Sequence, residues 1–263
     1  MPDPLRCYRL DVIHAGCSPW PLVLLVVAAL GCHKGTPESR APGNARDQEV
    51  WISLEGLGLA GPADVAAALE RPFDGTFPVA ALGADGVIRK GEVANCSQYF
   101  AMTQQGFQAV SDQDSFVLKT TGARCHALRM LVARGSHLTE PLIDLDFRKS
   151  GLGTLPPTLG PAPSPKAKAD RDAAAVAGMS WSTFEPSATL AAQSAHLAKV
   201  SGQTWSEKLE VWAIGDIRRA GTTEALVFSS VTGTEGSWFE IRLRFLDLRQ
   251  RRGIYPIVDE LGL

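Results

Sequence analysis

The sequence predicts an α+β fold with two structured regions. Three observations predict it: two segments rich in proline and polar residues divide the chain, a helical pattern lies in the first region, and alternating strand patterns dominate the second. With 263 residues, 45% of them hydrophobic, the chain is long enough to bury a sizeable core. Lys and Arg number 26 against 28 Asp and Glu, so the composition excludes a polybasic nucleic-acid binder.

Residues 1–31 have the pattern of a secretory signal peptide. Arg6 and Arg9 precede an apolar run of eleven residues, Trp20 to Leu30. About twenty apolar residues are needed to span a bilayer, so this run is too short for a transmembrane helix. Its length and its basic flank are typical of the apolar core of a cleaved leader.

The end of the apolar run resembles the lipobox of bacterial lipoproteins. The residues are Ala29-Leu30-Gly31-Cys32, with Ala29 where that family prefers Leu. The resemblance implies cleavage before Cys32, diacylglycerol on its sulfur and an acyl chain such as palmitate on the new amino group. Because His33 stands where the family's inner-membrane signal has Asp, it also implies an outer-membrane anchor facing the periplasm. An inner-membrane anchor and secretion are the alternatives.

Composition divides the rest of the chain into four segments. Residues 32–48 are the lipidated cysteine and a flexible tether, because they have few large apolar side chains. Residues 153–172 contain five prolines and are interpreted as an extended linker that cannot join a sheet interior. The structured regions are residues 49–152, expected to be α+β, and residues 173–263, expected to be β-rich.

The first structured region begins with a short strand and a short helix. Val50 to Leu54 is expected to be the strand, and Pro62 to Leu69 a helix with proline in its first turn. The clearest helix starts at Ser111, which forms a capping-box pattern with Asp114. Its inward face, at helical spacing, consists of Val117, Thr121, Cys125, Leu128 and Val132. Gly135 is the expected stop signal.

The second structured region is expected to contain a small antiparallel sheet. Trp238 to Leu248 alternates, which predicts one buried and one solvated face. The apolar face has Phe239, Ile241, Leu243 and Phe245, and the other has Glu240, Arg242 and Arg244. Lys208 to Ile217 and Ala225 to Ser230 predict two further strands. Ser187 to Val200 is Ala-rich and expected to be helical, with a strand as the alternative.

Gly56, Gly58 and Gly61 match the G-x-G-x-x-G pattern of dinucleotide sites. The pattern lies between an expected strand and an expected helix, where backbone N–H groups approach a pyrophosphate. Against this, the region shows no succession of βαβ units and no clear acidic partner. A plain strand-to-helix turn is the favoured interpretation. We expect no cofactor and, since the histidines lack ligand spacing, no metal.

Cys96 and Cys125 are the only cysteines after Cys32. In an oxidising periplasm they are most simply a disulfide, which would tie the helix from Ser111 to the segment before it. The alternative is that Cys125 is a nucleophile paired with His126. Neighbouring residues on a helix point in different directions, so this pairing is disfavoured.

Five arginines gather late in the chain. They are Arg242, Arg244, Arg249, Arg251 and Arg252. The favoured interpretation is a solvated strand face that discourages edge pairing, and the alternative is a contact for a partner. No interleaved aromatic residues indicate stacking on nucleic acid.

We therefore expect a membrane-anchored periplasmic lipoprotein that binds another macromolecule. Its partners would be the lipid bilayer, through Cys32, and a periplasmic protein, with no nucleic acid. An inhibitor or immunity protein and an accessory subunit of an envelope assembly are two versions that the sequence does not separate. The alternative is a secreted enzyme that uses the Gly56–Gly61 turn or Cys125.

Overall fold

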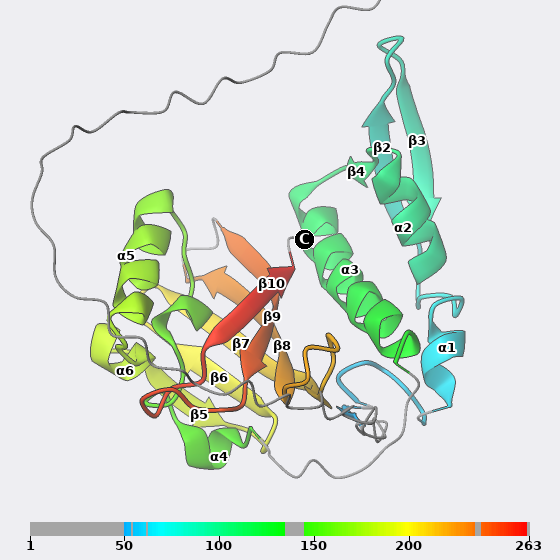
Figure 1. Cartoon of the computed structure of the whole chain (residues 1–263). Coiled ribbons are helices and arrows are strands. Elements are labelled where there is room, and N and C mark those ends of the chain that lie inside the picture. The colour runs from blue at the N-terminus through cyan, green and yellow to red at the C-terminus, as the bar shows by residue number, and fades with distance from the viewer. Residues whose placement is uncertain (1–49, 54, 62, 135–144, 235–237, 262–263) are drawn as a thin grey trace, which may run out of the picture. The chain divides into compact units, whose positions relative to one another are not determined.

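The computed structural model describes residues 50–53, 55–61, 63–134, 145–234 and 238–261 (Figure 1). In this part of the chain, helices and antiparallel strands form a mixed α+β fold, as predicted. The expected signal peptide, Cys32 and the tether lie outside the described residues. Within the described ranges, no helix has both the length and the apolar character needed to cross a bilayer.

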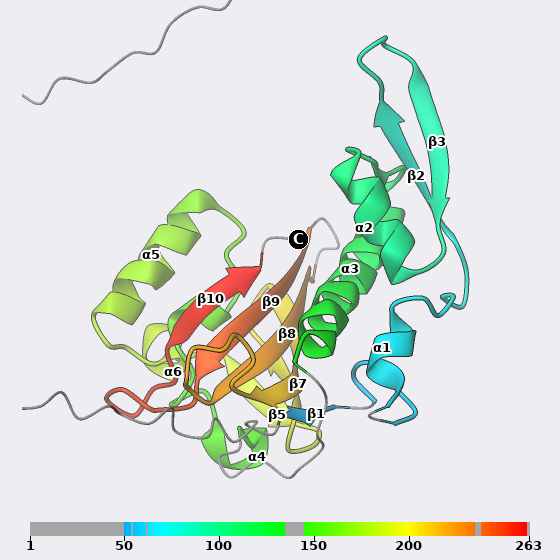
Figure 2. The ribbon, with the colours of Figure 1, turned by 45° about the vertical axis from the view of Figure 1, so that its right-hand side comes forward.

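Within the described residues, a seven-stranded antiparallel sheet forms the centre of the fold (Figures 1 and 2). Its strand order is β10-β9-β8-β7-β6-β5, and β1 pairs with β7 beyond the residues that pair with β6. The strands are β1 (Trp51–Ile52), β5 (Thr189–Ala192), β6 (Leu197–Ser201), β7 (Trp205–Gly215), β8 (Glu224–Gly233), β9 (Phe239–Asp247) and β10 (Ile257–Leu261). The observed sheet is thus larger than predicted, since β1, β5, β6 and β10 join the three strands expected there.

The N-terminal part adds helices and a smaller sheet of order β3-β2-β4. Its elements are α1 (Asp64–Ala68), β2 (Phe77–Leu82), β3 (Ile88–Val93), α2 (Cys96–Gln104), β4 (Gln108–Ala109) and α3 (Asp112–Val132). The backbone N–H of Asp114 donates to Ser111 Oγ (3.1 Å), so the predicted cap of α3 is confirmed. The hairpin of β2 and β3 was not predicted, and it extends beyond the helices (Figures 1 and 2).

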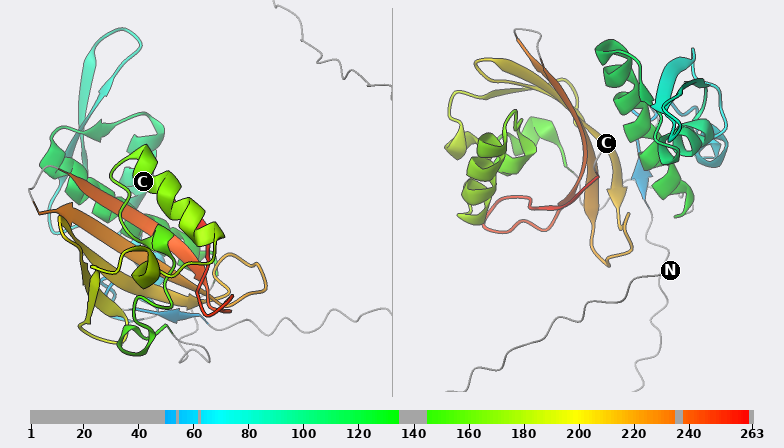
Figure 3. Two further views of the ribbon diagram at one scale, coloured as in Figure 1. Left: turned by 90° about the vertical axis from the view of Figure 1, so that its left-hand side faces the viewer. Right: turned by 90° about the horizontal axis from the view of Figure 1, so that it is seen from above.

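Both faces of the large sheet are covered (Figure 3). On one face α3 packs against β9, and a hydrophobic cluster joins Cys125 and Leu128 to Phe245. The other face carries α4 (Phe147–Ser150), η1 (Pro157–Leu159), α5 (Pro165–Val176) and α6 (Trp181–Phe184). Because β9 is buried on both sides from Ile241 onward, the prediction of one solvated face was wrong.

The regions 49–152 and 173–263 are not separate domains. β1 from the first pairs with β7 from the second, and both regions contribute to one hydrophobic cluster. They belong to one compact unit. The sequence does not predict this, because the apolar pattern of a two-residue strand or of a helix face does not identify the element that packs against it.

Residues 153–172 are not an extended linker: residues 155–161 are largely buried in the core, and Pro165 begins the helix α5, which is mostly exposed as far as residue 170. Leu155 and Leu159 are fully buried in the cluster beneath the sheet. Ser164 caps α5 by accepting a backbone N–H, and Pro165 occupies the first turn, where its missing donor is not needed. Proline content is shared by linkers and by irregular segments docked on a sheet, so it could not separate the two.

Ser187 to Val200 contains strands β5 and β6 in place of the expected helix. Thr189 pairs with Ser201, and Ala192 with Ala198. Along β6, Ala198 and Val200 are buried and Lys199 is exposed, which is the period of a strand. The alternative from the sequence is therefore correct. Alanine content favoured a helix, but burial against the sheet decided the structure.

Three buried arginines hold η1 in place, Arg242 and Arg244 from strand β9 of the large sheet and Arg171 from α5. Arg171, Arg242 and Arg244 are each more than nine-tenths buried. Each donates to a backbone carbonyl: Arg171 to Pro157 (2.8 Å), Arg242 to Gly160 (3.1 Å) and Arg244 to Leu159 (2.6 Å). Because proline has no backbone N–H, a proline-rich turn has few donors of its own, and guanidinium groups supply donors to its carbonyls. The Pro157 carbonyl also accepts the backbone N–H of Gly160 (3.0 Å).

The five late arginines therefore do not form one solvated face. Arg242 and Arg244 are internal, and Arg244 also donates to Glu260 (2.8 Å). Arg249 is exposed and paired with Asp247 (2.9 Å), while Arg251 and Arg252 are exposed as well. The alternation along β9 was correct, but the charged side points at the η1 carbonyls and not at water.

Glu207 of β7 is fully buried next to these arginines. Among the described residues, neither of its carboxyl oxygens has a hydrogen-bond partner, and neither does Ser229 Oγ on the neighbouring strand. Burial raises the pKa of Glu207 to about 8, against the opposing effect of the positive charge on Arg244. Glu207 is therefore mostly protonated at neutral pH.

We expect the free energy of unfolding to fall as the pH rises from about 4.5 to about 8. Over this window the carboxyl of the unfolded chain loses its proton while that of folded Glu207 keeps it, so ionisation stabilises the unfolded state. Glu207→Gln removes the difference. Urea unfolding at about pH 5 and about pH 8 should show a loss in the wild type that exceeds the loss in the variant by on the order of 3 kcal/mol.

Glu92→Gln is the matched control, because Glu92 is exposed on β3. This variant should lose as much stability with pH as the wild type does. A Glu207→Gln protein with the same pH dependence as the wild type would contradict the assignment of a raised pKa to Glu207.

Candidate functional site

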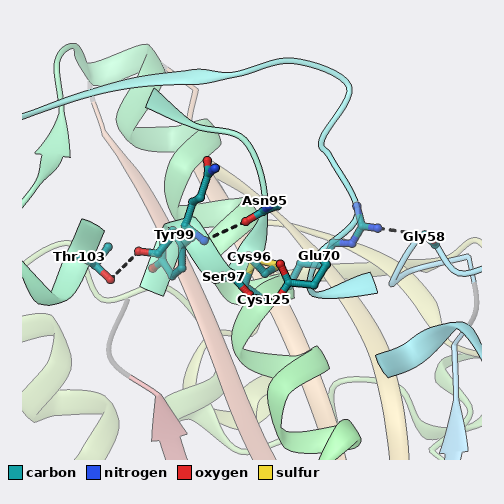
Figure 4. The surroundings of a disulfide bond; sticks show 10 residues. Gly58, Glu70, Asn95, Cys96, Ser97, Tyr99, Thr103 and Cys125 are labelled. Atoms are coloured by element: carbon teal, nitrogen blue, oxygen red, sulfur yellow. Dashed lines mark hydrogen bonds between the residues drawn. A yellow bond between two sulfur atoms is a disulfide. The ribbon is translucent and has the colours of Figure 1, made fainter. Parts of the chain in front are cut away.

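Cys96 and Cys125 form a disulfide of 2.05 Å, as predicted (Figure 4). It joins the first residue of α2 to the middle of α3, and both cysteines are buried. Because the Cys125 sulfur is bonded to Cys96, Cys125 is not a thiol nucleophile in this structure. The ring of His126 packs edge-on against Tyr99 and Phe100, and burial lowers its pKa.

The ends of α2 and its contact with α3 hold the disulfide in place. Asn95 Oδ1 accepts the backbone N–H of Gln98 (2.8 Å), which caps α2 immediately before Cys96. One turn later Tyr99 lies against Gly122 of α3, where an added Cβ would come within 2.3 Å of the phenol oxygen. The two helices can approach this closely because Gly122 has no side chain.

Gly56, Gly58 and Gly61 lie in a turn between β1 and α1. Gly58 has φ = +60°, a backbone conformation that favours glycine, and a Cβ there would lie 2.6 Å from the Arg124 guanidinium. The following helix is only five residues long. Asp64 Oδ2 accepts the backbone N–H of Ala60 (3.1 Å), so a carboxylate occupies one of the donors that a pyrophosphate would use.

A cavity of about 510 Å³ lies between this turn, the segment after α1, and α3. Cys96 forms part of its wall. Its apolar lining includes Phe73, Phe77 and Leu128, and its charged lining is Arg71, Asp74 and Arg124. The structure therefore brings two features of the sequence, the glycine turn and the disulfide, to one cavity. The sequence does not predict Arg71 and Arg124 as site residues, because each is a single basic residue with no motif around it.

The two arginines of the cavity converge on one carbonyl. Arg71 Nη1 and Arg124 Nη2 both donate to the Gly58 oxygen, at 3.4 and 3.3 Å. Arg124 Nε is buried and has no hydrogen-bond partner among the described residues. Burial lowers the pKa of Arg124, and the charge of Arg71 lowers it further, while Asp74 opposes both.

The tip of the β2–β3 hairpin carries exposed apolar side chains. Leu82, Val87 and Ile88 are 74%, 57% and 64% exposed. Their hairpin closes through the backbone N–H of Gly83, which donates to the Val87 carbonyl (2.9 Å). The turn residues 84–86, Ala-Asp-Gly, were a usable hairpin signal between two apolar runs.

Arg251 and Arg252 line a second cavity, of about 700 Å³, beside α5 and β10. Arg242, Arg244 and Arg249 are not part of it. In the described ranges, no three His, Cys, Asp or Glu side chains come together as a metal site requires.

The chain matches no protein-family model, no curated protein and no solved structure. Its function must therefore be inferred from the groups that the fold brings together. Two stand out: the cavity walled by Cys96, and the apolar hairpin tip of Leu82, Val87 and Ile88.

We expect the Cys96→Ser/Cys125→Ser double variant to lose about 3.5 kcal/mol of unfolding free energy, because the disulfide restricts a loop of 29 residues in the unfolded chain. Urea denaturation without reductant measures the loss. Adding dithiothreitol should destabilise the wild type by a similar amount and leave the double variant unchanged. A double variant as stable as the wild type would contradict a stabilising disulfide.

Proposed function

We propose that the protein is a membrane-anchored periplasmic lipoprotein that acts by binding another protein. The lipobox-like sequence at Cys32 supports the anchor. The Cys96–Cys125 disulfide supports an oxidising compartment, since such bonds persist in the periplasm and are rare in the cytosol. The exposed tip of Leu82, Val87 and Ile88 is the observation that carries the binding role.

The charges beside the tip favour a protein partner over an anionic membrane surface. Arg89 is paired with Asp85 (3.4 Å), and the exposed Lys90 and Glu92 stand two residues apart on β3 and carry opposite charges. This hairpin therefore has little net positive charge to attract anionic lipids. An apolar contact rimmed by charges of both signs is typical of a protein interface.

The edge of the smaller sheet offers a second kind of contact. Among the described strands, β3 pairs only with β2, so its outer edge has unpaired backbone donors and acceptors next to the apolar tip. A partner that adds a strand along β3 would gain backbone hydrogen bonds and also cover Val87 and Ile88. We therefore propose that the partner docks on β3 and the tip together.

An inhibitor or immunity protein and an accessory subunit of an envelope assembly both fit this contact and differ only in the partner. The alternative of a secreted enzyme has less support. Its cysteine version needs a free thiol at Cys125, which is bonded, and its nucleotide version needs the N–H groups of a turn where Asp64 already accepts one.

We expect Cys32→Ser to abolish lipid attachment. In cells fed radiolabelled palmitate, the wild type should be labelled and sediment with the outer membrane, whereas the variant should be unlabelled and leave the membrane fraction. Cys17→Ser is the matched control, because it removes a cysteine from the expected leader and should keep the label. An unlabelled, soluble wild type would overturn the proposed anchor.

We expect a photo-crosslinking residue at Val87 to yield one discrete adduct with an envelope protein in cells. The same residue at Val176, which is 88% exposed on α5, is the control and should not yield it. The purified partner should then bind the Leu82→Ser/Ile88→Ser variant at least about tenfold more weakly than the wild type. Adducts with lipid alone, or no adduct at all, would rule out protein docking through the tip.

A further inference from the structure

We infer that the cavity beside the Cys96–Cys125 disulfide binds a small organic anion. Arg71 and Arg124 hold its phosphate or carboxylate group, and Phe73 and Phe77 contact its apolar part. The cavity volume of about 510 Å³ is typical of small-molecule sites. This site uses none of the residues proposed for protein docking, so it goes beyond the proposed function.

The arginines have donors that the protein leaves unused. Each guanidinium has five N–H groups, and the two share the Gly58 carbonyl through long hydrogen bonds of 3.4 and 3.3 Å. The only carboxylate paired with Arg71 is Asp64, at 3.8 Å, among the described residues. Arg124 Nε is buried without a partner in the same part of the chain, a costly arrangement that an oxyanion would relieve.

The fold positions both arginines before any ligand arrives, and each guanidinium group donates to the Gly58 carbonyl. Arg124 precedes Cys125 on α3, and the disulfide ties that turn of the helix to α2. Gly58 leaves room for the Arg124 side chain against the turn. The backbone N–H of Arg71 donates to the Ala67 carbonyl at the end of α1 (3.1 Å). A preorganised pair of cations loses little entropy when an anion binds.

The charge balance and the walls define the ligand class. Arg71 and Arg124 face one lining carboxylate, Asp74, and Asp64 pairs with Arg71 from outside the lining, so the two cations are largely balanced and the site favours one anionic group over a polyanion. Phe73 and Phe77 lie with ring centroids 5.6 Å apart and form an aromatic wall. A ligand with an apolar body therefore gains contacts that inorganic phosphate cannot make.

Isothermal titration calorimetry of the purified full chain tests the site with phenyl phosphate, benzoate and inorganic phosphate. We expect saturable one-to-one binding of phenyl phosphate or benzoate, at least about tenfold tighter than that of inorganic phosphate. The stronger of the two aromatic probes identifies the anionic group. No saturable binding by either aromatic probe, or equal binding of inorganic phosphate, overturns the inference.

Arg124→Gln and Arg71→Gln should each weaken the stronger probe by at least about tenfold. Arg89→Gln is the matched control, since Arg89 is exposed on β3 and paired with Asp85. Thermal melting checks that each variant is folded. If Arg124→Gln is unfolded, Arg71→Gln decides, because the side chain of Arg71 is 41% exposed and its replacement leaves the core intact. Unchanged binding in Arg71→Gln overturns the inference.

Discussion

The hydrogen bonds from Arg171, Arg242 and Arg244 to the η1 carbonyls are the contacts on which the second face of the sheet depends. Strand β9 alternates between the two faces: Leu243 points to the cluster shared with α3, and Arg244 points to η1. Strand β9 therefore packs against α3 on one face of the sheet and against the proline-rich segment on the other. Loss of either α3 or the proline-rich segment would expose a buried face of the same sheet to water.

A buried acid among these cations shows how the interior balances charge. Glu185 and Glu260 pair with Arg171 and Arg244 at 2.7 and 2.8 Å, so the arginines already have anionic partners. Glu207 is left without a hydrogen bond among the described residues and is most stable in its neutral form. The polar layer beneath the sheet is thus a set of paired arginines with one protonated carboxyl.

The sequence predicted the features that depend on local pattern. The cap at Ser111, the core of β7, β8 and β9, and the Cys96–Cys125 pair follow from short-range spacing and from the small number of cysteines. It failed where the same local pattern has two tertiary outcomes. The charges of Arg242 and Arg244 predict a solvated face, but in the structure a segment with carbonyl acceptors packs on that face. The proline-rich stretch predicts a linker, but in the structure its leucines are buried.

The candidate cavity could not be predicted, because its charged groups come together only in the folded chain. Arg71 follows α1 and Arg124 lies within α3, and neither stands in a recognisable motif. The glycine motif around Gly58 predicts a backbone cradle for pyrophosphate, whereas in the structure Gly58 makes room for the Arg124 guanidinium. A glycine pattern therefore predicts close approach of another group to the backbone, but it does not identify whether that group is a ligand or a side chain of the protein.

Both candidate surfaces depend on α2 and α3, although neither surface is made by one of these helices alone. Cys96 forms part of the cavity wall, and Met102 and Phe107, at and just after the end of α2, pack within about 3.5 Å of where a side chain at Gly91 would lie in β3. The helix α3 is held on the large sheet by contacts such as Phe116 with Phe239, at 5.2 Å between ring centroids. The large sheet thus positions α3, and the disulfide attaches α2 to α3. The hairpin packs against the end of α2, and the cavity is lined by residues of both helices.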